Sequence, residues 1–346
     1  MADTSTRRRA VVVQAAGWNA PTVPFAVPSP TTVSRWASRF GPDGVHLFDR
    51  GTGLNVLLDE LDVGPEHWSR APRQVSVALT NACDLACSFC YAPKRPAVLD
   101  VDRVAAWAVE LASAGCLGVG FGGGEPTLYR RLPQLCREIT STTHLALTLT
   151  THGQRWTPKL VRELSGNVHF VRVSIDGVGS VYEQIRGRSF ADVSRRVELI
   201  ASAFPLGVNT VVNSAVLPTL DEVAAFAVSH GALELLLLPQ QPTRLLPGAD
   251  DDVVAALRDW IHGYRGPLRL AIGAAPDSGD LVGLPVADPL PGEVGLRSYA
   301  HVDASGWLRR SSYDTDGVPV GTGGVLASLD RLAAIDAGQA GLRGKA

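Results

Sequence analysis

Residues 80–91 of the chain read TNACDLACSFCY and contain three of its five cysteines, Cys83, Cys87 and Cys90. They directly follow the run Val75–Leu79, whose apolar and β-branched residues are typical of a buried strand. In folds built from βα units the active site lies at the carboxyl ends of the strands, which is where these thiols would be. Three closely spaced thiolates can enclose one compact metal centre, but they leave a fourth ligand position open. The stretch therefore predicts a metal site that an external ligand can reach.

The rest of the chain continues the alternation of strand and helix that begins here. We expect strands at Val75–Leu79, Gly118–Phe121, Leu145–Thr151, Val168–Ser174, Gly207–Asn213 and Leu233–Leu238. We expect helices between them at Val101–Ser113, Leu132–Thr140, Pro158–Leu164, Phe190–Phe204 and Leu220–Ser229. This alternation predicts an α/β fold around a parallel sheet. The 346 residues are enough for one barrel with extensions.

Residues outside this alternation divide the chain further. We expect an N-terminal extension at 1–70 with a β-hairpin at Val45–Leu58, and a core at 71–272. A Gly- and Pro-rich loop or linker follows at 273–293. The C-terminal segment, 294–346, is expected to hold a turn at 303–307 between two strand-like runs and a final helix near Val325–Ile335.

The composition narrows the range of partners and compartments. The net charge is -2 with 19% charged residues, so the chain lacks the basic surface typical of proteins that bind duplex nucleic acid. No apolar run approaches the roughly 20 residues that span a bilayer. An odd, clustered set of cysteines does not fit a secreted disulfide framework. We therefore expect a cytoplasmic protein that has no membrane partner and does not act on nucleic acid.

The cysteine spacing resembles that of the radical S-adenosylmethionine (radical SAM) superfamily. Its signature is Cys-x3-Cys-x2-Cys after the first strand of a partial (βα)6 barrel, with an aromatic residue before the last cysteine, here Phe89. The resemblance implies such a barrel with an N-terminal extension and a C-terminal cap. It also implies one [4Fe–4S] cluster on Cys83, Cys87 and Cys90, with S-adenosylmethionine chelating the fourth iron. Phe89 and Tyr91, which flank Cys90, are expected beside the cofactor.

A second match follows the second predicted strand. Residues 122–126 read GGGEP, and consecutive glycines let a backbone pass close to a ligand. The run is similar to the family's Gly-Gly-Glu-Pro motif, which binds the amino group of the cofactor's methionine moiety. The resemblance assigns that role to Gly123, Gly124, Glu125 and Pro126. A glycine run after a strand is by itself an ordinary turn, so this interpretation depends on the cysteines beside it.

Weaker matches follow the third, fourth and fifth strands. After the third strand, relatives in the family often carry Thr-Asn-Gly, and this chain has Thr151 followed by His152 and a glycine. His152 stands in place of the Asn and is interpreted as a polar surface or loop residue rather than a ligand. The resemblance places the cofactor's carboxylate and ribose near Ser174 and an arginine on or before the next helix. The arginines close enough in sequence for this role are Arg186, Arg188, Arg195 and Arg196. The remaining cofactor residues that it implies are Asp176, Arg186, Arg195, Val211 and Asn213.

Residues 301–332 look like the C-terminal extension of the SPASM/twitch subfamily, in which a hairpin carries cysteines for auxiliary clusters. Here Arg310 and Ser311 stand where such a cysteine would fall, and no cysteine follows Cys136. Thiolate ligation of an auxiliary cluster by this extension is therefore excluded. We expect the extension to persist as a metal-free cap.

The resemblance implies that one electron from the reduced cluster cleaves S-adenosylmethionine and that a 5′-deoxyadenosyl radical abstracts hydrogen from a substrate. Maturation of a ribosomally made peptide is the leading substrate class, with a small-molecule natural-product precursor as the alternative. An external electron donor such as flavodoxin or ferredoxin is implied. No catalytic acid–base pair is assigned, because this chemistry needs none.

A different class of function is a non-catalytic zinc-binding scaffold. A distant histidine, such as His144 or His152, would then complete a three-cysteine site. The two remaining cysteines are expected to pack in the core. Cys136 shares one helix face with apolar residues, and Cys116 lies before the second strand, at the end of the barrel opposite the cluster.

Overall fold

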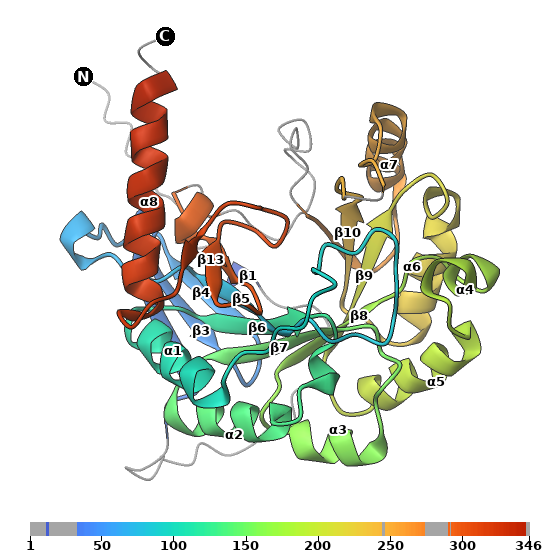
Figure 1. Ribbon diagram of the computed structural model, residues 1–346, viewed down its shortest axis with the longest axis horizontal. Helices are drawn as coiled ribbons and strands as arrows, with labels where there is room; N and C mark the ends of the chain where they lie inside the picture. The colour runs from blue at the N-terminus through green and yellow to red at the C-terminus, as the bar shows by residue number, and fades with distance from the viewer. Residues whose placement is uncertain (1–11, 14–32, 244–245, 274–289, 291, 344–346) are drawn as a thin grey trace.

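The computed structural model describes residues 12–13, 33–243, 246–273, 290 and 292–343, and it contains two sheets (Figure 1). The larger sheet has ten strands in the order β11-β10-β9-β8-β7-β6-β5-β12-β13-β14. Seven of them run parallel and follow the chain: β5 (Gln74–Thr80), β6 (Gly118–Gly123), β7 (Ala146–Thr151), β8 (Phe170–Ser174), β9 (Leu206–Val212), β10 (Glu234–Pro239) and β11 (Arg269–Ile272).

Helices cover the outer face of this sheet, as Figure 1 shows. They are α1 (Val101–Ser113), α2 (Leu132–Thr142), α3 (Pro158–Leu164), α4 (Ser180–Arg186), α5 (Phe190–Ala201), α6 (Leu220–Ser229) and α7 (Asp251–Gly263). The described part of the sheet does not close, so the fold is the expected partial barrel. The six predicted core strands and their connecting helices are confirmed. Helix α4 was not predicted as a helix.

Strand alternation separates the two faces of the sheet. On β5, Val75 and Val77 point into the core with α1, because successive side chains of a strand face opposite sides. Ser76 lies between them and faces the inner side together with small or polar residues of β6 and β8, Gly120, Gly122 and Ser174. This face borders open space at Gly122, where an added Cβ atom would meet no other atom within 4 Å.

The C-terminal segment joins the same sheet. Strand β12 (Tyr299–Val302) pairs in parallel with β5, and β13 (Trp307–Arg309) and β14 (Val318–Pro319) follow as antiparallel strands. The expected turn at 303–307 thus connects β12 to β13. The pairing of β12 with β5 was not predicted, because hydrophobic pattern shows that a strand exists but not which strand it joins.

The final helix, α8, spans Gly324–Arg343 and is longer than expected. Its N-terminus is capped from another helix: the carboxylate of Glu110 on α1 accepts hydrogen bonds of 2.9 Å from the backbone N–H groups of Val325 and Leu326. A carboxylate there satisfies unpaired N–H groups and favours the helix dipole.

The smaller sheet has the order β1-β4-β3-β2 and holds the predicted hairpin, β3 (Gly44–Asp49) with β4 (Leu54–Leu58). Strand β1 (Val12–Val13) pairs with β4. Strand β2 (Trp36–Gly41) was not predicted, since Arg39 interrupts its apolar alternation. That arginine is 1% exposed and donates to Glu293 Oε1 at 2.6 Å and to the carbonyl oxygens of Ala71 and Arg297. It therefore connects the extension, the core and the C-terminal segment.

Most of the predicted loop at 273–293 and most of residues 1–32 lie outside the described residues. The expected domain boundaries there stay predictions. Among the helices that the structure describes, none combines the length and apolar character needed to cross a bilayer.

Candidate metal centre

The cysteine stretch is fixed against the glycine run Gly122–Gly124 at the end of β6. The N–H of Gly124 donates to Thr80 O at 2.7 Å, and the N–H of Glu125 donates to Ala82 O at 2.8 Å. A Cβ atom on Gly124 would lie 2.3 Å from Ala82 O, and one on Gly123, where φ is +122°, would lie 2.3 Å from Thr80 O. Only glycine permits this approach. The predicted neighbours Gly123 and Gly124 are thus brought to the cysteine stretch.

Open space lies beside this contact. A Cβ atom added to Gly122, one residue earlier on β6, would meet no atom within 4 Å. The glycine run therefore does two different things: its later residues pack against the cysteine stretch, and Gly122 borders a space next to it.

The three thiols are free, and Cys87 is buried while Cys83 and Cys90 are half-buried. Burial raises the pKa of the Cys83 and Cys87 thiols, because a thiolate there is poorly solvated. The protein alone does not supply enough positive charge to ionise them, whereas a bound cation deprotonates a coordinating thiol. The donor set therefore fits a thiolate-bound metal or cluster. Cys116 and Cys136 are 0% exposed in the core, as predicted.

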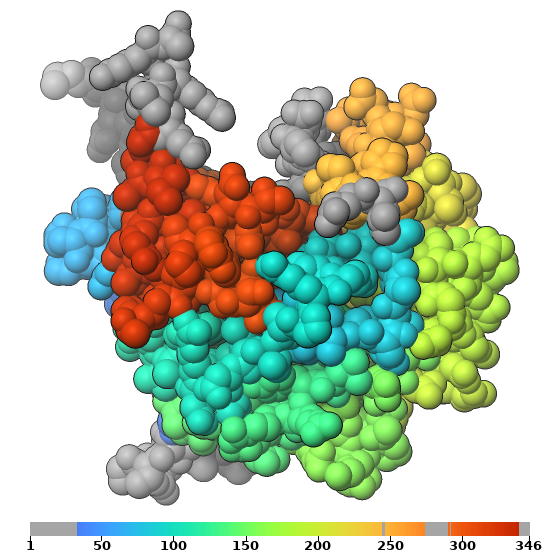
Figure 2. Space-filling view, viewed as in Figure 1, coloured from blue at the N-terminus to red at the C-terminus, as the bar shows by residue number. Residues whose placement is uncertain are grey.

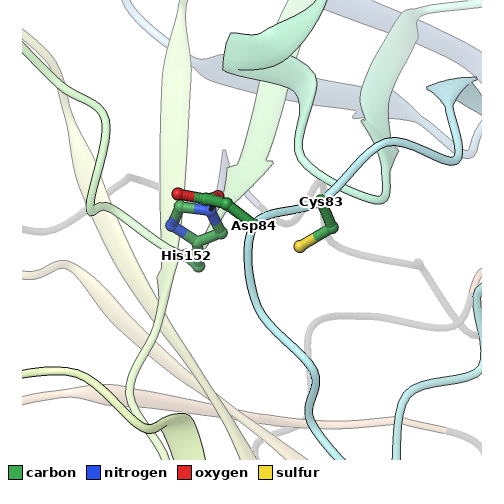
Figure 3. Close-up of side chains that lie close together, drawn as sticks. All are labelled: Cys83, Asp84 and His152. Carbon is green, nitrogen blue, oxygen red and sulfur yellow. Dashed lines mark hydrogen bonds and ion pairs between the residues drawn. The ribbon is translucent and has the colours of Figure 1, made fainter.

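His152 is buried rather than on the surface, which corrects one half of its interpretation as a surface or loop residue. It is 4% exposed and follows β7, and its Nε2 lies 2.9 Å from Asp84 Oδ1 (Figure 3). Its Nδ1 accepts from the N–H of Gln154 at 3.0 Å, which leaves Nε2 as the ring nitrogen that donates to Asp84. Asp84 Oδ2 also accepts from Arg155 Nε at 3.1 Å. Burial opposes ionisation of Asp84, but His152 and Arg155 hold its pKa below the usual value.

Asp84, His152 and Cys83 each place one ligand atom within 4.8 Å of the others, which is a donor set that a single metal ion can use (Figure 3). Two histidines were considered for a zinc scaffold, and of these His152 lies beside the cysteines. His144 is elsewhere: its backbone partner is Cys116, before β6.

The Glu125 carboxylate joins its own loop to the chain at the end of β7. Its carboxylate is 0% exposed and accepts from Thr127 N at 3.1 Å, Thr127 Oγ1 at 2.6 Å, Thr151 Oγ1 at 2.7 Å and His152 N at 2.9 Å. A carboxylate offers about four acceptor positions, so a ligand's ammonium would have to share these oxygens. Thr151 is brought to the site by its contact with Glu125. Pro126, which follows Glu125 in the chain, is buried at the start of a short helical turn, Pro126–Leu128.

Arg186, at the end of α4, reaches one of the cysteines. Its Nη1 donates to Cys87 Sγ at 3.6 Å, its Nη2 forms an ion pair with Asp176, and its guanidinium lies 5.4 Å from the centre of the Phe89 ring. Burial alone would lower the pKa of Arg186, but Asp176 and Cys87 raise it. Asp176 is 0% exposed, and its Oδ1 accepts from Val211 N at 2.7 Å. Four of the predicted cofactor residues are therefore brought together beside Cys87: Phe89, Asp176, Arg186 and Val211.

The structure does not bring all predicted residues into this group. Arg195 is exposed on α5 and forms an ion pair with Asp192. Asn213, after β9, donates to Gln240 Oε1 at 3.0 Å and accepts from backbone N–H groups of its own loop. Ser174 is half-buried at the end of β8. Their predicted contacts with a cofactor stay predictions.

Tyr91 extends the site towards the C-terminal segment. Its ring lies 5.3 Å from the ring of Tyr313 and 6.4 Å from that of His301, and in Figure 2 the segment after β5 abuts the C-terminal segment. Ser76 Oγ lies 2.5 Å from Tyr299 Oη and 2.6 Å from His301 Nδ1. Burial lowers the pKa of His301 to about 4, so it is neutral at pH 7.

Sequence reasoning missed Ser76, Tyr299 and His301 as neighbours of the cysteine stretch. Tyr299 and His301 are alternate residues of β12, which indicates one shared face. That face is directed at the site because β12 pairs with β5. The sequence therefore indicated that Tyr299 and His301 share a face, but it did not indicate which strand that face adjoins.

A sequence profile of the Radical SAM superfamily matches residues 77–227. The sporulation killing factor maturation protein SkfB of Bacillus subtilis is 30% identical over 195 residues, covering 54% of this chain and 47% of that protein. The GTP 3′,8-cyclase of Chlorobaculum tepidum is 30% identical over 135 residues, covering 38% of this chain and 39% of that protein. The chain thus spans about half the length, or less, of these relatives.

The fold is similar to that of Streptococcus suis SuiB bound to its precursor peptide SuiA. The TM-score is 0.67 at 13% sequence identity, covering 86% of this chain and 87% of SuiB. SuiB bound to S-adenosylmethionine is similar with a TM-score of 0.62. At this identity the likeness concerns the fold.

Proposed function

The chain belongs to the radical SAM superfamily, and from this premise we propose that it holds one [4Fe–4S] cluster on Cys83, Cys87 and Cys90 and cleaves S-adenosylmethionine reductively. When bound, the reduced cluster supplies the single electron that breaks the cofactor's sulfonium bond. The observation that carries the proposal is the placement of three free thiols at the carboxyl end of β5, directly against the glycine run and beside open space.

The chain's own residues position the reactants. Gly123 and Gly124 let the two loops approach each other, while Glu125 and the His152–Asp84 pair hold the cysteine stretch to the loop after β7. Such fixed polar contacts keep the stretch from rearranging when a ligand binds. Tyr91 and Tyr313 form an aromatic contact at the side of the site, with their ring centres 5.3 Å apart.

We propose a ribosomally made peptide as the substrate, matured by hydrogen abstraction. The maturation protein among the relatives and the peptide-bound structure of similar fold support this class. The GTP 3′,8-cyclase relative supports the second candidate, a small molecule. An external donor such as flavodoxin or ferredoxin would supply the electron, in the cytoplasm.

Mass spectrometry after anaerobic incubation with S-adenosylmethionine and dithionite separates the two substrate classes. One arm contains a panel of candidate precursor peptides and the other contains GTP. A mass change of a peptide that requires both the cofactor and the reductant supports the proposal. Conversion of GTP, with every peptide unchanged, contradicts the peptide class and favours the small-molecule class.

The rival function is a zinc scaffold. Cys83, Asp84 and His152 are the group of side chains that could hold its zinc ion. Metal analysis of anaerobically purified and reconstituted protein distinguishes the two. About four irons per chain with a brown colour supports the cluster. Colourless protein with one zinc and no iron contradicts it.

A further inference from the structure

Arg186 contacts the sulfur of one of the three clustered cysteines. Its side chain is only 9% exposed, and its Nη1 donates to the sulfur of Cys87 at 3.6 Å. Asp176 binds the same guanidinium from another direction, and Val211 N in turn holds Asp176 at 2.7 Å. The guanidinium also lies over the ring of Phe89. Its position is thus fixed from three sides, by the buried Cys87 and Asp176 and by the half-buried Phe89.

A hydrogen bond to a ligating sulfur changes the balance between the two oxidation states of an iron–sulfur cluster. Reduction adds one negative charge, and a nearby cationic donor stabilises the more negative state. The effect is larger when the donor is buried, because water screens it less. Asp176 acts in the opposite direction, since its charge is also close to Cys87.

We propose that Arg186, oriented by Asp176, sets the reduction potential of the cluster through its hydrogen bond to Cys87. This inference rests on the proposed function, because it takes Cys87 as a cluster ligand. Arg186 acts through the cysteine and is a positioning residue in this role. Its Nε is buried without a hydrogen-bond partner among the described protein atoms, so one donor remains for a bound ligand.

The test is a redox titration of the reconstituted protein followed by electron paramagnetic resonance, in the absence of S-adenosylmethionine. Omitting the cofactor removes any contribution from its contacts with Arg186. Arg186→Gln is expected to shift the midpoint potential to a more negative value than in the unmodified protein. Arg186→Lys, which keeps the charge, is expected to fall between the two.

Asp176→Asn provides a second variant with the opposite expected sign. It removes a buried negative charge near Cys87 and keeps a side-chain oxygen that can accept from Arg186, so the midpoint potential is expected to become less negative. The matched control is Arg162→Gln, which removes the same charge from the exposed face of α3 and is expected to leave the potential unchanged.

An Arg186→Gln potential equal to that of the unmodified protein, or less negative, would overturn the inference. If Arg186→Gln does not take up its irons, Arg186→Lys decides: a potential more negative than in the unmodified protein supports the inference, and an equal or less negative one overturns it. Failure of the unmodified protein to bind iron would contradict the proposed function instead, so the two failures are distinguishable.

Discussion

His152 Nε2 lies 2.9 Å from Asp84 Oδ1, which connects the loop after β7 to a residue inside the Cys-x3-Cys spacing. Because Asp84 stands between Cys83 and Cys87, this bond helps to fix the conformation in which the thiols share one site. Both ring nitrogens have protein partners, since Nδ1 accepts from the Gln154 N–H, so we interpret His152 as a support for the stretch rather than as a metal ligand.

Replacing this histidine tests that role. His152→Ala leaves a partly buried carboxylate without one of its donors, at a cost of about 1–3 kcal/mol. We expect a lower denaturation midpoint and a reduced yield of iron per chain, with the cluster still present. The control is His262→Ala on the exposed side of α7, which should change neither quantity. Complete loss of metal in His152→Ala would instead make His152 a ligand.

Two neighbouring glycines are expected to respond differently to the same substitution. In Gly124→Ala the new Cβ would lie 2.3 Å from Ala82 O, so the cysteine stretch must move and iron uptake should fall several-fold. In Gly122→Ala the new methyl group meets no protein atom within 4 Å, so iron uptake should be normal. If Gly122 borders the cofactor's space, Gly122→Ala should weaken binding of S-adenosylmethionine, measured by calorimetry. Equal iron uptake in both variants would count against this arrangement.

The buried His301 predicts a pH dependence of stability. Burial lowers its pKa to about 4 from the ordinary 6.5, so the unfolded chain binds the proton more readily than the folded one between these values. Stability is therefore complete above pH 6.5 and is lost as the pH falls towards 4, by about 1 kcal/mol at pH 5.5. Urea unfolding at pH 7.0 and 5.5 measures this loss. The loss should shrink in His301→Gln, and an unchanged loss would show that other groups cause it.

Much of the fold was predictable because its signals are local. The apolar run before Cys83, the glycines after β6 and the helix at Pro158–Leu164 each follow from neighbouring residues. The hairpin of β3 and β4 was predicted for the same reason, since its turn residues lie between two short apolar runs.

The features that were missed depend on contacts between distant residues. The pairing of β12 with β5 brings Tyr299 and His301 to Ser76, more than two hundred residues away in sequence. The burial of His152 results from its contact with Asp84, which no periodic pattern contains. Arg186 was predicted as one of several arginines, and only the folded chain distinguishes it, by its contact with Cys87, from the exposed Arg195.

The most direct test of the central claim is the amount of 5′-deoxyadenosine formed when reconstituted protein is incubated anaerobically with S-adenosylmethionine and dithionite. We expect this product from the unmodified protein and from Cys136→Ser, whose thiol is buried in the core, and none from Cys87→Ala. Absence of the product from unmodified protein carrying about four irons per chain would contradict reductive cleavage of S-adenosylmethionine by this protein.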